Sequence, residues 1–129
     1  MDEDYRNQKT GAPSVWDMLV FQKAYGLALE IHKASQGFPA SEQYELANQL
    51  RRSSKSICAN LAEGRARQQG SSAEFRRYVL IALGSADESQ LWLRFAKDLG
   101  FIDDKLWRTF DERMREISKM LNGLASKLR

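Results

Sequence analysis

Apolar residues recur every three or four positions through nearly all of the sequence after residue 14, and this spacing constrains the fold more than any other feature. Such spacing places side chains on one face of an α-helix, whereas a strand requires alternation at every second residue. No segment alternates over strand length, and no Asn-Gly or Asp-Gly hairpin signal occurs. The clearest helical run consists of Leu106, Phe110, Met114, Ile117, Leu121, Leu124 and Leu128.

Glycine and proline divide this pattern into four segments. Gly37 and Pro39 end the first, Gly70 follows the second, and Gly100 ends the third, since glycine suits the left-handed cap position and proline cannot continue a helix. Short connections between long helices are typical of an all-α, antiparallel, up-down-up-down four-helix bundle. The helices are expected at residues 15–36, 42–69, 72–99 and 104–127.

The length of 129 residues suits one domain with a buried core. We expect the bundle to occupy residues 14–129 and residues 1–13 to form a disordered tail, because the tail is polar and lacks periodicity. No apolar run approaches the roughly 20 residues needed to cross a bilayer, so no membrane partner is expected. One cysteine and an acidic N-terminus unlike a signal peptide favour the cytoplasm.

Positive charge is concentrated in the middle of the sequence. Residues 51–77 contain seven basic and two acidic side chains, whereas the whole chain has a net charge of +3. Such a region can attract phosphate, although similar clusters are common on proteins that bind no nucleic acid. The predicted nucleic-acid-binding residues are Arg51, Arg52, Lys55, Arg65, Arg67, Arg76 and Arg77.

A line of polar side chains also runs along the second expected helix, about 100° from its apolar face. It carries hydrogen-bonding groups where an ordinary solvent face would be rich in Lys and Glu. These groups either fix the register of a bundle or subunit interface or contact a ligand. We favour the structural interpretation, because the line borders the core. Besides Arg52, the line contains Gln49, Ser56, Asn60 and Glu63.

The first and third expected helices carry more apolar residues than one bundle core needs. Large exposed apolar patches usually mark interfaces, and aromatic residues are enriched there. The alternative is a wide core face with partly exposed rim residues; we favour self-association. The predicted interface residues are Phe21, Tyr25, Leu80, Gly84, Leu91, Trp92 and Phe95.

The sequence offers no recognisable catalytic or metal site. His32 is the only histidine and Cys58 the only cysteine, whereas zinc needs more such ligands and a di-iron bundle needs Glu-x-x-His pairs. We interpret His32 as a surface residue and Cys58 as buried and unreactive. No catalytic residue, metal or cofactor is therefore predicted.

Several motifs together resemble a known bacterial family, the 23S rRNA intervening-sequence proteins. They are Tyr44-x-Leu46-x-x-Gln49-Leu50-Arg51-Arg52, Ser56-Ile57-x-Ala59-Asn60-Leu61-Ala62-Glu63-Gly64, Glu74-Phe75-x-x-Tyr78-x-x-x-Ala82-x-Gly84-Ser85 and Asp98-Leu99-Gly100-Phe101-Ile102. The resemblance covers about residues 16–120 and implies a four-helix bundle that assembles into a homopentamer. The accessory proteins of diversity-generating retroelements look like a related branch, which implies a nucleic-acid-bound protein as a further partner.

Two classes of function remain open. The first is a non-enzymatic oligomeric scaffold whose basic surface binds RNA or DNA weakly and without sequence specificity. Base reading is not expected, because the aromatic residues nearest the arginines, Phe75 and Tyr78, are assigned to packing. The alternative is a protein-protein interaction module for an acidic partner, with no nucleic acid involved.

Overall fold

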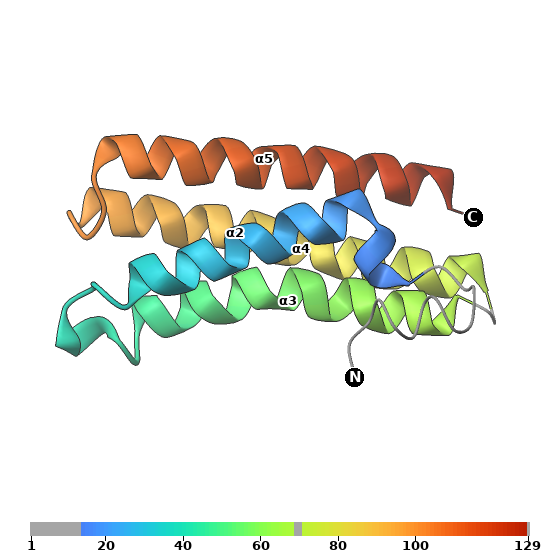
Figure 1. Ribbon diagram of the computed structural model, residues 1–129, viewed down its shortest axis with the longest axis horizontal. Helices are drawn as coiled ribbons and strands as arrows, with labels where there is room; N and C mark the ends of the chain where they lie inside the picture. The colour runs from blue at the N-terminus through green and yellow to red at the C-terminus, as the bar shows by residue number, and fades with distance from the viewer. Residues whose placement is uncertain (1–13, 69–70, 129) are drawn as a thin grey trace.

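The computed structural model describes residues 14–68 and 71–128. Four long helices run alternately up and down in one bundle (Figure 1). The described residues contain no strand, so the predicted all-α, up-down-up-down four-helix bundle is confirmed. The helices are α2 (Leu19–Ser35), α3 (Leu46–Arg67), α4 (Ser72–Asp98) and α5 (Asp104–Lys127), and short 3₁₀ helices η1 (Val15–Asp17) and η2 (Ala40–Glu42) precede α2 and α3.

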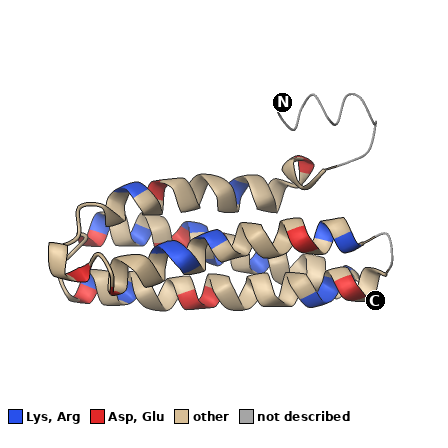
Figure 2. Ribbon diagram, turned by 90° about the horizontal axis from the view of Figure 1, so that it is seen from below, with Lys and Arg blue, Asp and Glu red and all other residues tan. Residues whose placement is uncertain are grey.

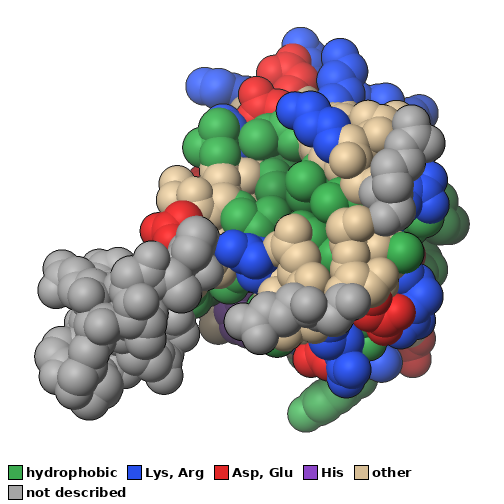
Figure 3. All heavy atoms as spheres, turned by 90° about the vertical axis from the view of Figure 1, so that its right-hand side faces the viewer, with side chains coloured by type: hydrophobic (Ala, Val, Ile, Leu, Met, Phe, Trp, Pro, Cys, Tyr) green, Lys and Arg blue, Asp and Glu red, His purple; other side chains and the backbone are tan. Residues whose placement is uncertain are grey.

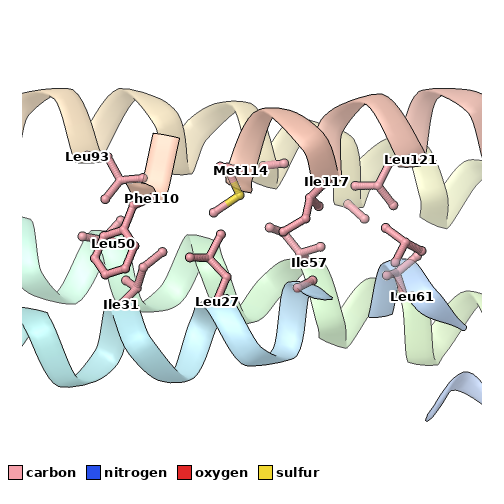
Figure 4. Close-up of a cluster of buried hydrophobic side chains, with 14 of the residues drawn as sticks. Leu27, Ile31, Leu50, Ile57, Leu61, Leu93, Phe110, Met114, Ile117 and Leu121 are labelled. Carbon is pink, nitrogen blue, oxygen red and sulfur yellow. The ribbon is translucent and has the colours of Figure 1, made fainter. Parts of the chain in front are cut away.

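The core lies between all four helices. Each contributes the face on which its apolar residues recur, and these side chains meet along the bundle axis (Figure 4). α3 packs mainly against α4 and α2, and α5 packs against α4 and α2, so α2 and α4 lie on opposite sides of the bundle. The labelled core residues are Leu27, Ile31, Leu50, Ile57, Leu61, Leu93, Phe110, Met114, Ile117 and Leu121.

Two helices begin later than their apolar patterns predict. Ser14 and Asp17 form a capping box that closes η1, and Met18 then adopts an extended conformation, so α2 starts at Leu19 and not at residue 15. η2 follows Pro39, and the Glu42 side chain accepts a hydrogen bond from the Leu46 amide at 3.3 Å. That bond satisfies the first amide of α3, which starts at Leu46, four residues beyond the predicted start.

The other helix boundaries lie close to prediction. α4 begins after Ser71, whose hydroxyl accepts from the amides of Ala73 and Glu74. It ends before Gly100, which has a positive φ of 81° and supplies the expected left-handed cap. α5 spans the predicted residues 104–127. The predicted tail over residues 1–13 and the predicted end of the second helix at residue 69 lie outside the described residues.

Candidate nucleic-acid interface and neighbouring surfaces

The structure divides the seven predicted basic residues into three groups. Arg65, Arg67, Arg76 and Arg77 lie around the α3–α4 connection, at the same end of the bundle. Figure 3 views that end and shows Lys and Arg side chains around a central apolar area. Figure 2 shows Lys and Arg interspersed with Asp and Glu along the bundle. Four of the seven predicted basic residues therefore gather at one end of the bundle, where Glu63 and Glu74 accompany them.

Each arginine at this end already has a neighbour within the protomer. Arg67 pairs with Glu63 at 2.7 Å, and Arg77 pairs with Glu74 at 2.8 Å. The Arg76 side chain donates to the Ala125 carbonyl at 3.2 Å, which ties α4 to α5. Arg65 donates to the Gln68 side chain. The two ion pairs are substantially exposed, so solvent screens them and leaves part of each guanidinium available.

Tyr78 lies between the two ion pairs. The Arg77 guanidinium carbon lies 4.7 Å from the Tyr78 ring centroid and that of Arg67 lies 5.9 Å from it, so the ring attracts both cations. The hydrogen bond from Arg77 lowers the pKa of Glu74. The hydrogen bond to Glu63 raises the pKa of Arg67, although an arginine is charged at physiological pH without such a bond. The ring therefore organises the arginines and is partly covered by them, which leaves it poorly placed to stack on a base.

Arg51, also predicted to bind nucleic acid, is held by contacts within the protomer and lies apart from the arginines at the end of the bundle. Its guanidinium is half-buried and donates to the Ser35 hydroxyl at 2.8 Å, to the Gln43 side-chain oxygen at 3.2 Å and to the Gln43 carbonyl at 2.9 Å. These bonds hold the connection between α2 and α3. Arg51 has a structural role here because three acceptors on that connection converge on one planar cation.

Arg52 and Lys55 are exposed but lie on different sides of α3. Arg52 lines a polar hollow of about 260 Å³ between α3 and α4, together with Gln49, Ser56 and Ser85. Lys55 lines a separate groove between α3 and α2. Neither side chain has a hydrogen bond or ion pair with any described residue. The structure therefore does not join these two cations to the arginines at the end of the bundle.

The predicted polar line makes fewer contacts between helices than expected. Ser56 accepts a hydrogen bond from Ser85 of α4 at 3.0 Å, and Gln49 is exposed at the polar hollow. Asn60, however, donates to the Ser56 carbonyl and hydroxyl within α3, and Glu63 pairs with Arg67 within α3. Within the described protomer, only Ser56 of this line bonds across the bundle.

Sequence reasoning missed two serines that join α3 to α4. Ser53 and Ser89 are buried, and the Ser89 hydroxyl lies 2.9 Å from that of Ser53. Both residues occupy core-facing positions of their helices. The helical spacing of these positions is compatible with a place where α3 contacts α4. The sequence did not predict that these two serines would contact each other, because contacts between two helices depend on how far one helix is shifted along the other. The same holds for the Arg51 contacts with Ser35 and Gln43.

The predicted interface residues differ in how far they are exposed to solvent. Phe21 is a correction: it is 4% exposed and packs edge-on against Trp16 within the protomer, with ring centroids 4.8 Å apart. Trp92 is partly buried, and its indole N–H donates to Glu88 at 2.8 Å. The remaining predicted residues are exposed, namely Tyr25, Leu80, Gly84, Leu91 and Phe95.

Exposed apolar residues continue along the outer side of α4. Ile81 and Leu99 are also exposed and extend the line formed by Leu80, Leu91 and Phe95. A Cβ atom added to Gly84 would meet no atom within 4 Å. We call this surface the α4 outer face; its residues stay exposed in the protomer, although Phe95 and Leu99 border a hollow shared with Leu46 of α3.

His32 and Cys58 line the same groove, which the sequence did not reveal. His32 is half-buried rather than fully exposed, and its Nδ1 atom is buried without a hydrogen-bond partner in the described structure. Burial and the positive charges of Lys55 and Arg51 lower the pKa of His32. Burial raises the pKa of Cys58 to about 11. Both side chains are therefore neutral near pH 7, unlike the charged pair of an activated nucleophile.

No three His, Cys, Asp or Glu side chains of the described segments lie close enough together to hold a metal ion. None of the helices in these segments combines the length and apolarity needed to span a membrane.

Comparison with known proteins identifies the family. The model of the family described as 23S rRNA-intervening sequence protein matches residues 16–123. The chain belongs to the 23S rRNA-intervening sequence protein family. The motifs on α3 and α4 that carried the resemblance lie within the matched range. No curated protein matches the chain.

A solved structure supports this assignment. It is described as a protein with unknown function from the S23 ribosomal protein family from Bacteroides thetaiotaomicron. The two chains are 29% identical, the match covers 83% of this chain and 98% of that chain, and the TM-score is 0.74. Membership in the 23S rRNA-intervening sequence protein family therefore accounts for the helical fold. It does not assign an activity to the chain.

Proposed function

We propose that this chain is a non-enzymatic, self-associating scaffold of the cytoplasm that binds RNA or DNA weakly and without sequence specificity. The observation that supports nucleic-acid binding best is the group of four arginines at the α3–α4 end of the bundle. Two carboxylates, Glu63 and Glu74, pair with them, so positive charge remains in excess there. Exposed guanidinium groups can donate to phosphate oxygens, which is the basis of sequence-independent binding.

The proposed assembly rests on the α4 outer face and the exposed apolar residues of α2. Leu19, Tyr25 and Leu29 are exposed on α2, which lies across the bundle from α4. Two different apolar surfaces on opposite sides favour a heterologous contact, in which α4 of one copy meets α2 of the next. A heterologous contact gives a ring when its rotation closes and an open filament when it does not. Only the family resemblance supplies a closed ring and five as the number of copies. A ring would repeat the arginine end and strengthen weak binding through multivalency.

The test is fluorescence anisotropy with labelled RNA and DNA at low and moderate salt. Binding should be similar for unrelated sequences, and the logarithm of the affinity should fall linearly with the logarithm of salt concentration. Changing Arg65, Arg67, Arg76 and Arg77 together to Gln should lower the affinity at least tenfold. Absence of binding at low salt, or unchanged affinity in this variant, would refute the proposal.

A matched variant controls for total charge. Changing Arg94, Lys105, Arg108 and Lys119 to Gln removes the same number of cations from exposed positions of α4 and α5 away from the arginine end. It should weaken binding much less than the first variant. Circular dichroism of both variants checks that the helices remain, since Arg76 also contacts the Ala125 carbonyl.

A second candidate is binding of an acidic protein partner. The observation that favours it is Arg52, which is unpaired among the described residues and borders the polar hollow with Gln49, Ser56 and Ser85. The Glu88 carboxylate also lines this hollow, but it accepts a hydrogen bond from the Trp92 indole and does not pair with Arg52. One guanidinium with neighbouring amide and hydroxyl groups suits a carboxylate side chain. If Arg52→Gln weakens capture of such a protein while the nucleic-acid assay shows no binding, this candidate replaces the first.

A further inference from the structure

A mostly apolar groove of about 410 Å³ follows the seam between α2 and α3. Tyr25, Ala28, Leu29 and His32 line it from α2, while Lys55 and Cys58 line it from α3. A cavity of this volume with few polar groups is typical of a binding site. The groove is thus large enough for an aromatic side chain and the segment that carries it.

The charge at this groove is positive. Lys55 lies at the groove without an ion pair to any described residue, and the Arg51 guanidinium lies close enough for both cations to depress protonation of His32. Among the described residues, no Asp or Glu lines the groove. An occupant should therefore combine an apolar side chain with negative charge.

The described chain begins at this same seam. η1 contacts both α2 and α3, and Trp16 of η1 packs edge-on against Tyr25 with ring centroids 4.9 Å apart. Tyr25 also lines the groove, so Ser14, which caps η1, is adjacent to one end of the groove. The first described residue therefore lies beside this groove.

The sequence before Ser14 has the chemistry that the groove requires. Asp2, Glu3 and Asp4 provide three carboxylates next to Tyr5. The nine residues from Tyr5 to Ser14 can span roughly 30 Å when extended. The groove extends over two helical turns from Tyr25 to His32, or roughly 10 Å. The segment therefore has ample length to reach every part of the groove.

We propose that the N-terminal segment of the same chain occupies the α2–α3 groove, with Tyr5 against Tyr25 and Leu29 and the acidic residues facing Lys55. This goes beyond the proposed function and assigns an intramolecular ligand to a surface of α2. A neighbouring copy seated on Tyr25 would compete with the segment, so the segment would regulate the proposed assembly.

Cys58 permits a direct test, because it is the only cysteine and lines the groove. The variant Arg6→Cys keeps Tyr5 and the carboxylates and adds a second thiol beside them. With oxidised glutathione as the electron acceptor, the two thiols lose two electrons and two protons to form a disulfide. Its rate is followed by mass spectrometry of peptides from dilute protein. The disulfide should form at a rate independent of protein concentration.

Thr10→Cys is the matched control, because residue 10 is nearer the bundle and an undirected tail would bring it to Cys58 at least as fast. Disulfide formation should be at least fivefold faster in Arg6→Cys than in Thr10→Cys. Adding Tyr5→Ser, Lys55→Gln, or Asp2→Asn with Glu3→Gln and Asp4→Asn should each remove most of that advantage. Lys33→Gln, an exposed change on α2 outside the groove, should leave it unchanged.

Three outcomes would overturn the proposal. The first is an equal or lower rate in Arg6→Cys than in Thr10→Cys. The second is a disulfide that forms only between chains, at a rate that rises with concentration. The third is a preference that survives loss of both Tyr5 and Lys55. None of these outcomes depends on whether nucleic acid binds, so the two proposals fail independently.

Discussion

Gly64 leaves no room for a side chain where α3 meets α4. A Cβ atom at this position would lie 2.6 Å from the Tyr78 Cβ and 2.9 Å from the Phe75 ring. The Tyr78 Cβ is attached directly to the backbone, so it can move away only if α4 moves. We predict that Gly64→Ala lowers the free energy of unfolding by about 1–3 kcal/mol, because overpacking outweighs a gain of about 1 kcal/mol in helix propensity.

Gly123→Ala is the matched change for that prediction, since Gly123 is exposed on α5 and a Cβ there meets no atom within 4 Å. Urea unfolding at one fixed protomer concentration should show Gly123→Ala as stable as the natural chain or up to about 1 kcal/mol more stable. Equal stability of the two variants would mean that the helices do not approach closely at Gly64.

His32 makes stability depend on pH. Burial, Lys55 and Arg51 lower its pKa in the folded chain below the ordinary 6.5. Below about pH 6.5 the unfolded chain therefore binds a proton that the folded chain does not bind. The contribution is complete above pH 6.5 and decreases as pH falls toward the folded pKa. We predict a lower free energy of unfolding at pH 5.5 than at pH 7.5, and a smaller difference in His32→Phe.

Calorimetry or urea unfolding at these two pH values would measure the effect. Equal stability at both pH values, or the same difference in His32→Phe, would show that His32 is not the responsible group. Sequence alone predicted a surface histidine, because a single sequence does not reveal which helix covers a residue. His32 and Cys58 line the same groove only because α2 packs on α3.

At the scale of elements, Arg51 joins the end of α2 to the start of α3. Its neighbour Arg52 has no partner among the described residues. We predict that Arg51→Gln lowers the free energy of unfolding by about 1.5–3 kcal/mol, since charged hydrogen bonds are lost and the Gln43 carbonyl loses its donor. Arg52→Gln should change it by less than about 0.5 kcal/mol. Urea denaturation of the two variants gives the comparison, and similar losses would contradict the structural role of Arg51.

The periodicity of the apolar residues predicted all four helices, but it did not predict where α2 and α3 begin. The periodic apolar residues of the first segment begin at Trp16, but the Ser14 and Asp17 capping box closes a separate turn before α2. The start of α3 depends on a Glu42 side chain that reaches the Leu46 amide. Side chains that bond to backbone amides lie at both boundaries, and a repeat of three or four apolar residues does not encode such bonds.

For the whole molecule, we predict association through the α4 outer face. Leu91 and Phe95 are 51% and 47% exposed, and removing such apolar surface from water drives assembly. Sedimentation at micromolar concentration should show a species larger than the 14.8 kDa protomer. Leu91→Lys with Phe95→Lys should shift it toward the protomer. Tyr44→Lys, at a position 90% exposed outside this face, should not.

A single protomer-sized species for the natural chain would refute the association. Loss of assembly in Tyr44→Lys as well would show that added charge, and not the α4 outer face, controls it. The sequence indicated an excess of apolar residues but placed Phe21 on an exposed surface. A wide apolar face on a helix does not reveal which of its two edges the core covers. That edge is set by η1, which brings Trp16 over Phe21.

The packing within the bundle is uneven. α3 and α4, which follow one another in the chain, share the most extensive helix contact, whereas α2 and α5, the pair that closes the bundle, share the least. Contacts between neighbours in sequence form with little loss of chain entropy, and closure of α2 on α5 must wait until nearly the whole chain is in place. The α3–α4 hairpin should therefore fold first and retain its amide protons longest during hydrogen exchange, while the α2–α5 seam forms last and opens first.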